Sequence, residues 1–305
     1  TARVNLNYVG PPIDFLHGPD TTPSETKAVF ATATIHPTEA LSFTAGLRYT
    51  EDKKDYTYFR SNPDGSVPNP GACAPPPATD WWSTPNCLLA GIYDITGSFK
   101  GDRTDWRAVA DYRFTDSFMA YGSVATGFKG GGVNPRPFFE TQRLPFDPET
   151  LTTYEVGFKS DWLDRKLRLN GAVFLNKYDD IQLRKQSCPE SAPYPDQPCL
   201  RPDNIGAADV KGFELEASIY PLPGLTIDAT ASVLDFEYTS PADPLSGFLV
   251  NTAIPANGIT PYTPEETYSA GVQYDHSISS GVVSFRLDAA DQSAVLDNSG
   301  YTARW

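Results

Sequence analysis

Hydrophobic and polar residues alternate with a period of two along most of this chain, which is the pattern of a β-strand with one apolar and one polar side. In residues 41–49, Leu41, Phe43, Ala45, Leu47 and Tyr49 alternate with Ser, Thr, Gly and Arg. The same pattern recurs in 29–35, 106–114, 118–129, 151–161, 167–186, 205–220, 225–238, 265–275 and 281–290. With 1–9 and 300–305, about a dozen strands are predicted, and no amphipathic helix of ordinary length. The predicted fold class is all-β.

The connections between these strands alternate between tight turns and long loops. The short ones are 36–40, 115–117, 162–166, 221–224 and 276–280, and the long ones are 61–96, 130–150, 187–204 and 240–262. Strands that always turn tightly at one end and loop widely at the other are typical of an antiparallel up-and-down transmembrane β-barrel. The sequence therefore predicts short periplasmic turns and long extracellular loops in a bacterial outer membrane.

A soluble β-protein would alternate in the same way, with its apolar faces buried against a second sheet. Three features favour lipid instead. The polar faces are rich in Thr, Ser, Asn, Arg and Asp, which suits a wet lumen. Several strands run beyond the roughly 9 to 11 residues that a tilted membrane strand needs. Aromatic residues also gather near strand ends, where an interfacial girdle is expected; they include Tyr49, Tyr56, Tyr58, Phe59, Phe114, Phe118, Trp162 and Tyr220.

Composition and charge restrict the function further. The chain has 305 residues, a mean hydropathy of -0.37 and a net charge of -14. The acidic balance argues against nucleic acid, whose phosphates require a basic surface. No apolar run approaches the roughly 18 residues of a spanning helix, which excludes an inner-membrane helical protein. A barrel with a polar lumen and polar loops is compatible with all of these values.

The four cysteines fall in two of the predicted long loops. Cys73 and Cys87 lie in 61–96, and Cys188 and Cys199 lie in 187–204. Four cysteines permit three pairings, but the loop-local bridges Cys73–Cys87 and Cys188–Cys199 need no contact between distant loops. Each bridge would stabilise the protein by about 3 kcal/mol in the chain-entropy model. Disulfides indicate passage through the periplasm.

No arrangement of residues typical of a catalytic site is found. The histidines are His17, His36 and His276, and the last two fall in predicted tight turns. The glycine run 130–132 follows a strand but lacks the Lys-Ser/Thr pair and the helix of a phosphate-binding loop. The sequence thus predicts a protein that is not an enzyme and that has no cofactor or resident metal.

Several motifs together resemble one family. They are ATGFKGGGVN at 125–134, PETLTTYEVGFK at 148–159, LNGAVF at 169–174, YDDIQ at 178–182, ADVKGFELE at 208–216 and LSFTAGLRY at 41–49. Their order and spacing resemble the β-barrel of TonB-dependent outer-membrane receptors.

The resemblance implies a 22-stranded barrel, closed inside by an N-terminal plug domain, that imports scarce ligands with energy from the inner membrane. Ferric siderophores or other iron complexes are the expected cargo. Residues 1–305 would then be a partial barrel domain, because neither a plug nor the segment that engages the TonB complex is recognised in them. A passive outer-membrane porin is the alternative, and a soluble carbohydrate-binding β-protein is a further one.

Ligand contacts are expected in the long loops, where aromatic rings offer stacking surfaces and cations pair with anionic ligands. Loop packing is the alternative role for the aromatic residues, and outer-membrane lipid or lipopolysaccharide is the alternative partner of the cations. The candidates are Trp81, Trp82, Tyr93, Lys129, Arg136, Phe138 and Phe139.

Overall fold

The structure is a computed structural model that describes residues 2–6, 13–68, 91–135, 137, 140–185, 201–240 and 262–295. The four cysteines lie outside the described residues, and so do Trp81, Trp82, Arg136, Phe138, Phe139 and the predicted strand 300–305. No helix in the described ranges is long and apolar enough to cross a membrane.

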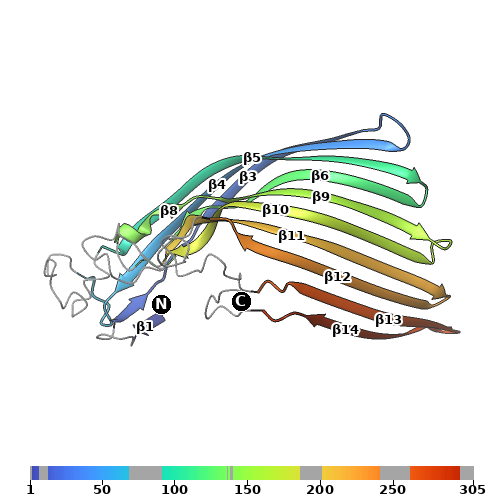
Figure 1. Ribbon diagram of the computed structural model, residues 1–305. Coiled ribbons are helices and arrows are strands. Elements are labelled where there is room, and N and C mark those ends of the chain that lie inside the picture. The colour runs from blue at the N-terminus through green and yellow to red at the C-terminus, as the bar shows by residue number, and fades with distance from the viewer. Residues whose placement is uncertain are drawn as a thin grey trace.

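The described residues form a 12-stranded antiparallel sheet, curved along its width (Figure 1). The sheet order is β1-β2-β4-β5-β6-β9-β10-β11-β12-β13-β14, with β3 paired to β4, and β7 and β8 pair separately. The strands are β1 (Ala2–Leu6), β2 (Ile13–His17), β3 (Ser24–Ile35), β4 (Leu41–Ser61), β5 (Tyr93–Thr115), β6 (Phe118–Lys129), β7 (Gly132–Val133), β8 (Pro145–Phe146), β9 (Glu149–Trp162), β10 (Leu167–Lys185), β11 (Arg201–Leu222), β12 (Leu225–Tyr238), β13 (Glu266–Ile278) and β14 (Gly281–Gln292). The 3-10 helix η3 spans Glu140–Arg143.

All five predicted tight turns are confirmed, and they gather at one end of the sheet (Figure 1), here called the turn end. Local chemistry explains two of them. Before β4, Thr38 Oγ1 accepts a hydrogen bond from the backbone N–H of Leu41 at 3.0 Å, as short hydroxyl side chains commonly do in turns. Between β11 and β12, Gly224 adopts a φ of 82°, which side chains with a Cβ rarely tolerate. The long connections leave from the opposite end, here called the loop end.

The sheet has one apolar and one polar face. Odd-numbered residues of β4 from Leu41 to Tyr49 lie on the apolar face, which no other described element covers; Leu47 there is 57% exposed and Val156 on β9 is 61% exposed. Side chains of this size rarely stay exposed to water over so wide an area. The apolar face therefore needs a partner, and the polar face can line a wet interior.

The apolar face forms a continuous band. It covers nine residues on several strands: 41–49 on β4, 106–114 on β5, 154–162 on β9 and 167–175 on β10. This length matches the roughly 9 to 11 residues of a tilted membrane strand. Along its turn-end border, the ring of Phe118 lies 5.6 Å from Phe114 and 6.5 Å from Trp162, measured between centroids. This border has the aromatic girdle that the sequence predicted.

Three local features differ from the sequence-based prediction. The strand β2 was not predicted, because its five residues are too few to show a period; it pairs with β1 and with the end of β4. The predicted loop 130–150 contains β7, η3 and β8. Tyr56 and Tyr58 were assigned to the aromatic girdle, but both lie on the polar face, where their rings stack, and Tyr58 is fully buried. The girdle assignment of Tyr56 and Tyr58 was wrong because β4 continues well beyond the apolar band, to Ser61.

Candidate ligand-facing site at the loop end

The strands β4 and β5 extend beyond the apolar band at the loop end. With 21 and 23 residues, they are about twice as long as a membrane crossing requires. The polar face of this extension carries buried side chains of β4, among them Asp52, Tyr58 and Arg60, with exposed fractions of 9%, 0% and 1%. Buried polar groups of this kind need partners. Asp52 accepts a hydrogen bond from Thr26 on β3, Arg60 is paired with Asp20, and Tyr58 finds its partner in the segment between β6 and β9.

That segment, residues 130–148 and here called the inner loop, lies against the polar face of β4 and β5. Lys54 Nζ donates a hydrogen bond to the carbonyl oxygen of Gly131 at 2.8 Å. A Cβ added to Gly131 would collide with the Phe99 ring and with the Phe146 carbonyl oxygen. A Cβ on Gly130 would lie 2.7 Å from Asp52 Oδ2. The glycine run is thus required for close approach of the inner loop to the wall.

Hydrogen bonds among the buried residues Tyr58, Asn134 and Gln142 hold the middle of the inner loop. The hydroxyl of Tyr58 donates to the carbonyl oxygen of Asn134 at 2.6 Å, and Asn134 Nδ2 donates to the carbonyl oxygen of Gln142 at 3.1 Å. Asn134 and Gln142 are fully buried. Burial raises the pKa of Tyr58 well above its ordinary value, so this phenol stays neutral and remains a donor.

An ion pair links the loop end of β4 to the segment between β2 and β3. The guanidinium of Arg60 donates to Asp20 at 2.7 Å, and both side chains are buried. Asp20 also accepts hydrogen bonds from the Tyr56 hydroxyl at 2.9 Å and from the backbone N–H of Phe59 at 3.0 Å. Burial acts to raise the pKa of Asp20, but the hydrogen bonds from Arg60 and Phe59 outweigh it and hold that pKa below its ordinary value. Asp20 is therefore a permanent anion at neutral pH.

The far end of the inner loop is tied to β10 and β11. Gln182 Nε2 donates to the carbonyl oxygens of Gly130 and Asp147 at 3.1 and 3.0 Å. Asn204 Nδ2 donates to the Asp147 carbonyl oxygen at 2.8 Å, and Asn204 Oδ1 accepts from the Asp147 N–H at 2.7 Å. Both ends of the inner loop are thus anchored to the wall, on opposite sides of β6 and β9.

Two of the predicted ligand residues lie within the described ranges. Lys129 is the last residue of β6, on the polar face next to the inner loop; its Nζ is 3.7 Å from Glu149 Oε2 and its side chain is 62% exposed. Tyr93 begins β5 opposite Phe59, and their rings meet edge to face at 5.6 Å between centroids. Because Phe59 is odd-numbered in β4, this pair lies on the apolar side. The structure brings Lys129, but not Tyr93, to the inner loop.

Asp20, Tyr58, Arg60 and Asn134 were not among the candidates. The alternation of β4, continued past the apolar band, would have placed Tyr56, Tyr58 and Arg60 on the polar face. No short-range signal in the sequence identifies Asp20 or Asn134 as their partners.

The chain matches the family model of the TonB dependent receptor-like β-barrel over residues 2–304. The chain belongs to the TonB-dependent receptor family. Members of this family are receptors and transporters of the Gram-negative outer membrane. The apolar band thus faces lipid and the polar face lines the interior of a transmembrane barrel. A passive porin and a soluble carbohydrate-binding protein are not supported by this match.

The relatives of this TonB-dependent receptor chain are considerably longer than it is. The pesticin receptor of Yersinia pestis is 26% identical over 241 residues, which are 79% of this chain and 30% of that protein. Among solved structures, the ferric yersiniabactin uptake receptor FyuA from Yersinia pestis has a TM-score of 0.64 at 22% identity, covering 94% of this chain and 37% of that one. The alcaligin outer membrane receptor FauA from Bordetella pertussis has a TM-score of 0.56 at 17% identity, covering 98% and 45%. These structures share the fold, whereas the expected total of 22 strands stays a prediction.

Proposed function

We propose that this chain forms part of the wall of an outer-membrane receptor that imports a ferric siderophore with energy from the TonB complex. The observation that carries the proposal is the family match over residues 2–304. The names of similar proteins, a ferric yersiniabactin uptake receptor and a probable TonB-dependent siderophore receptor of Acinetobacter baumannii, support the siderophore as cargo. The chain acts as a receptor and not as an enzyme.

Residues 1–305 serve as a partial barrel domain in this proposal. The chain spans about a third of the length of its relatives. The further barrel strands, the plug domain and the segment that contacts the TonB complex belong to the rest of a longer protein.

The inner loop is the proposed ligand-contacting element. Its two ends are fixed by Lys54, Gln182 and Asn204, and Asn134 and Gln142 between them are buried against the polar face at the loop end. In this proposal Arg136, Phe138 and Phe139 contact the ligand together with Lys129. A guanidinium, an ammonium and aromatic rings suit an anionic, ring-containing iron chelate. In the same proposal, Trp81 and Trp82 contribute from the connection between β4 and β5, and Tyr93, the first residue of β5, contributes from the outer rim of the wall.

The bridges Cys73–Cys87 and Cys188–Cys199 are proposed to hold two of the extracellular loops in shape. Outer-membrane lipid and lipopolysaccharide are the proposed partners of the outer surface.

Uptake of radioactive iron by cells that carry the full-length gene tests this function. A deletion strain is supplied with ferric catecholate, hydroxamate, phenolate and citrate complexes under iron limitation, with and without an intact TonB system. We expect one class of ferric siderophore to be imported, only when the gene and TonB are both present. Uptake that persists without TonB would identify a passive pore instead.

The variant Lys129→Gln tests the site within the same assay. We expect it to weaken binding of the imported complex by about tenfold, because a charge-assisted contact is lost. Lys159→Gln is the matched control, since Lys159 is also an exposed lysine of the polar face but lies near the turn end. Equal effects of the two substitutions would exclude the inner loop as the binding site.

A further inference from the structure

Two arginines face the interior at a depth where the other face of the wall is apolar. Arg48 on β4 and Arg107 on β5 belong to the polar face, because Arg107 is the register partner of Gly46. Both fall within the residues that form the apolar band on their strands. Both side chains are exposed. Ionisable groups that face a wet interior at membrane depth often line the pathway of a charged substrate.

Neither arginine forms an ion pair within the part of the chain that the structure describes. Asp105 is the register partner of Arg48, but Asp105 is buried and its Oδ1 accepts a hydrogen bond from Arg103 Nε at 2.7 Å. Arg48 Nε donates to Thr50 Oγ1 at 3.1 Å. Three arginines and one aspartate leave this group with two positive charges.

The other carboxylates of the polar face near these arginines have partners or stand further away. Asp52 on β4 and Asp111 on β5 are each four residues from the arginine of the same strand, which is about 13 Å. Asp52 also lies 3.2 Å from Lys54 Nζ. Glu155 is two strands away from β5, on β9, and accepts a hydrogen bond from the Tyr121 hydroxyl at 2.7 Å. The positive charges of Arg48 and Arg107 therefore remain available to an anion.

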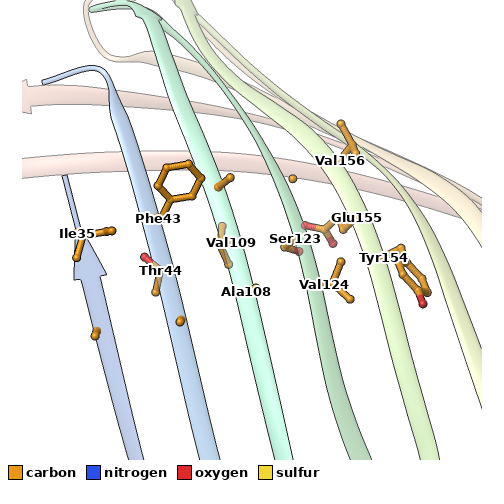
Figure 2. Close-up of a pocket in the computed structure, with 14 residues that line it drawn as sticks. Ile35, Phe43, Thr44, Ala108, Val109, Ser123, Val124, Tyr154, Glu155 and Val156 are labelled. Atoms are coloured by element: carbon orange, nitrogen blue, oxygen red, sulfur yellow. The ribbon is translucent and has the colours of Figure 1, made fainter. Parts of the chain in front are cut away.

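Hydroxyl groups surround Arg107. A Cβ added to Gly46 would stand 3.0 Å from Arg107 Cγ and 3.4 Å from Thr32 Oγ1, so the stem of Arg107 lies across Gly46 beside Thr32. In the next row of the sheet, Thr44 on β4 and Ser123 on β6 lie on either side of β5 (Figure 2). Guanidinium and hydroxyl groups together can donate several hydrogen bonds to an oxygen-rich anion.

An aromatic ring lies next to Arg48 on the same face. Phe30 on β3 is the register partner of Arg48, which places it on the polar face, and it is 72% exposed. Its neighbours on this face of β3, Ala28 and Thr32, are small, so both sides of the ring are accessible. An exposed ring beside arginines offers a stacking surface to an anionic compound that contains rings.

This surface lies below the inner loop on the way to the turn end. Arg107 pairs with Ala125 on β6, and Lys129 is four residues further towards the loop end, about 13 Å along the strand. A ligand that leaves Lys129 and the inner loop towards the periplasm can therefore meet Arg107 next.

We propose that Phe30, Arg48 and Arg107 form a second binding site for the imported ferric chelate, here called the inner station. The ligand it takes is anionic, oxygen-rich and ring-containing. It contacts this site after it has left the inner loop and before it reaches the periplasm. The inner station rests on the proposed import function, and it assigns the passage of the ligand to the wall formed by β3, β4 and β5.

Binding and uptake by the full-length protein in cells test the inner station. The probes are radioactive ferric catecholate, hydroxamate, phenolate and citrate complexes. Equilibrium binding to cells without TonB measures the first contact, and initial uptake with TonB measures passage. We expect Arg48→Gln and Arg107→Gln each to slow uptake about tenfold with an unchanged dissociation constant, because a charge-assisted contact is lost only during passage. Phe30→Leu should also slow uptake. Lys129→Gln should instead weaken the equilibrium binding.

Three further variants serve as controls. Arg113→Gln removes an exposed arginine from the same face of β5, six residues nearer the turn end, and should leave uptake unchanged. Arg107→Lys keeps the charge and Phe30→Tyr keeps the ring, so both should restore most of the rate. The amount of folded receptor, measured by its electrophoretic mobility before and after heating, normalises every rate.

The possible outcomes separate the inner station from other roles. A normal uptake rate in Arg107→Gln, or an equal loss in Arg113→Gln, would overturn the inner station while leaving the import function in place. Greater sensitivity of cells with Arg107→Gln to vancomycin, without any siderophore, would assign this arginine to contact with the plug domain and would also overturn it. If the unchanged protein imports none of the four complexes, the proposed function fails and the inner station fails with it.

Discussion

At the scale of single residues, the glycine run 130–132 shows how the inner loop is held. Gly131 fits between the Phe99 ring and the Phe146 carbonyl oxygen with no space for a Cβ. We expect Gly131→Ala to destabilise the attachment of this loop by about 1–3 kcal/mol, as overpacking does elsewhere. Hydrogen exchange of the backbone amides in 130–148 should then become faster, while exchange in β9 and β10 stays unchanged.

Gly127→Ala is the control for this substitution. Gly127 lies four residues earlier, on β6, and has open space where a Cβ would stand. Similar exchange in the two variants would show that the close approach at Gly131 does not hold the loop.

The ion pair of Asp20 and Arg60 makes stability depend on pH. The pKa of Asp20 is lower in the folded protein than its ordinary value, which is about 3.9 when unfolded. The stabilisation is thus fully present above about pH 4 and is lost as the pH falls through the folded-state pKa. Melting temperature measured between pH 2 and 7 should fall in the acid range, and it should fall less for Asp20→Asn, whose amide cannot titrate.

Asp116→Asn is the matched control, because Asp116 lies in the exposed turn between β5 and β6. A pH profile of Asp20→Asn that is as steep as that of the unchanged protein would assign the acid sensitivity to other carboxylates.

At the scale of elements, the hairpins were predictable and the inner loop was not. Period-two alternation located β3 to β6 and β9 to β14, because each of these strands meets lipid on one face and a polar interior on the other. The same alternation could not show that β4 extends to Ser61, where Tyr58 and Arg60 meet Asp20 and Asn134. Arg60 and Asp20 are 40 positions apart and Tyr58 and Asn134 are 76 apart, so these contacts depend on tertiary packing.

The cost of placing an arginine on the apolar band should depend on its depth in the membrane. Ala45 lies at the centre of the band 41–49 and faces lipid. We expect Ala45→Arg to lower the free energy of unfolding by about 2–4 kcal/mol, as arginine does at the bilayer midplane, whereas Tyr49→Arg at the border should cost about 0–1 kcal/mol for its charge. Reversible unfolding of the full-length protein from lipid vesicles measures both.

Ser123→Arg is the control that distinguishes the polar face of the sheet from the lipid-facing one. Ser123 lies on the polar face and pairs with Glu155 on β9, so an arginine there meets water and a carboxylate. A loss of stability as large as that of Ala45→Arg would contradict the assignment of the odd-numbered face of β4 to lipid.

At the scale of the whole molecule, the sheet formed by the described residues has two long edges. There β3 pairs with β4 alone and β14 pairs with β13 alone. Each edge strand has 12 residues, and the outer hydrogen-bonding groups of both strands would be unsatisfied in lipid. Lipid cannot tolerate such edges, so both must be paired in a closed barrel, and we expect further strands to join β3 and β14.

This argument predicts how the 305-residue chain behaves without those strands. Expressed alone and refolded in detergent, the chain should form oligomers through β3 and β14. The unpaired backbone N–H and C=O groups of these edge strands can hydrogen-bond to the edge strands of another copy. The full-length protein should instead be monodisperse and should show the shift in electrophoretic mobility on heating that closed barrels give. Crosslinks between cysteines introduced at Thr32 and Asp288 would form between copies of the isolated chain. A monodisperse, protease-resistant monomer of residues 1–305 would mean that β3 and β14 close on each other, and that the barrel is smaller than its relatives imply.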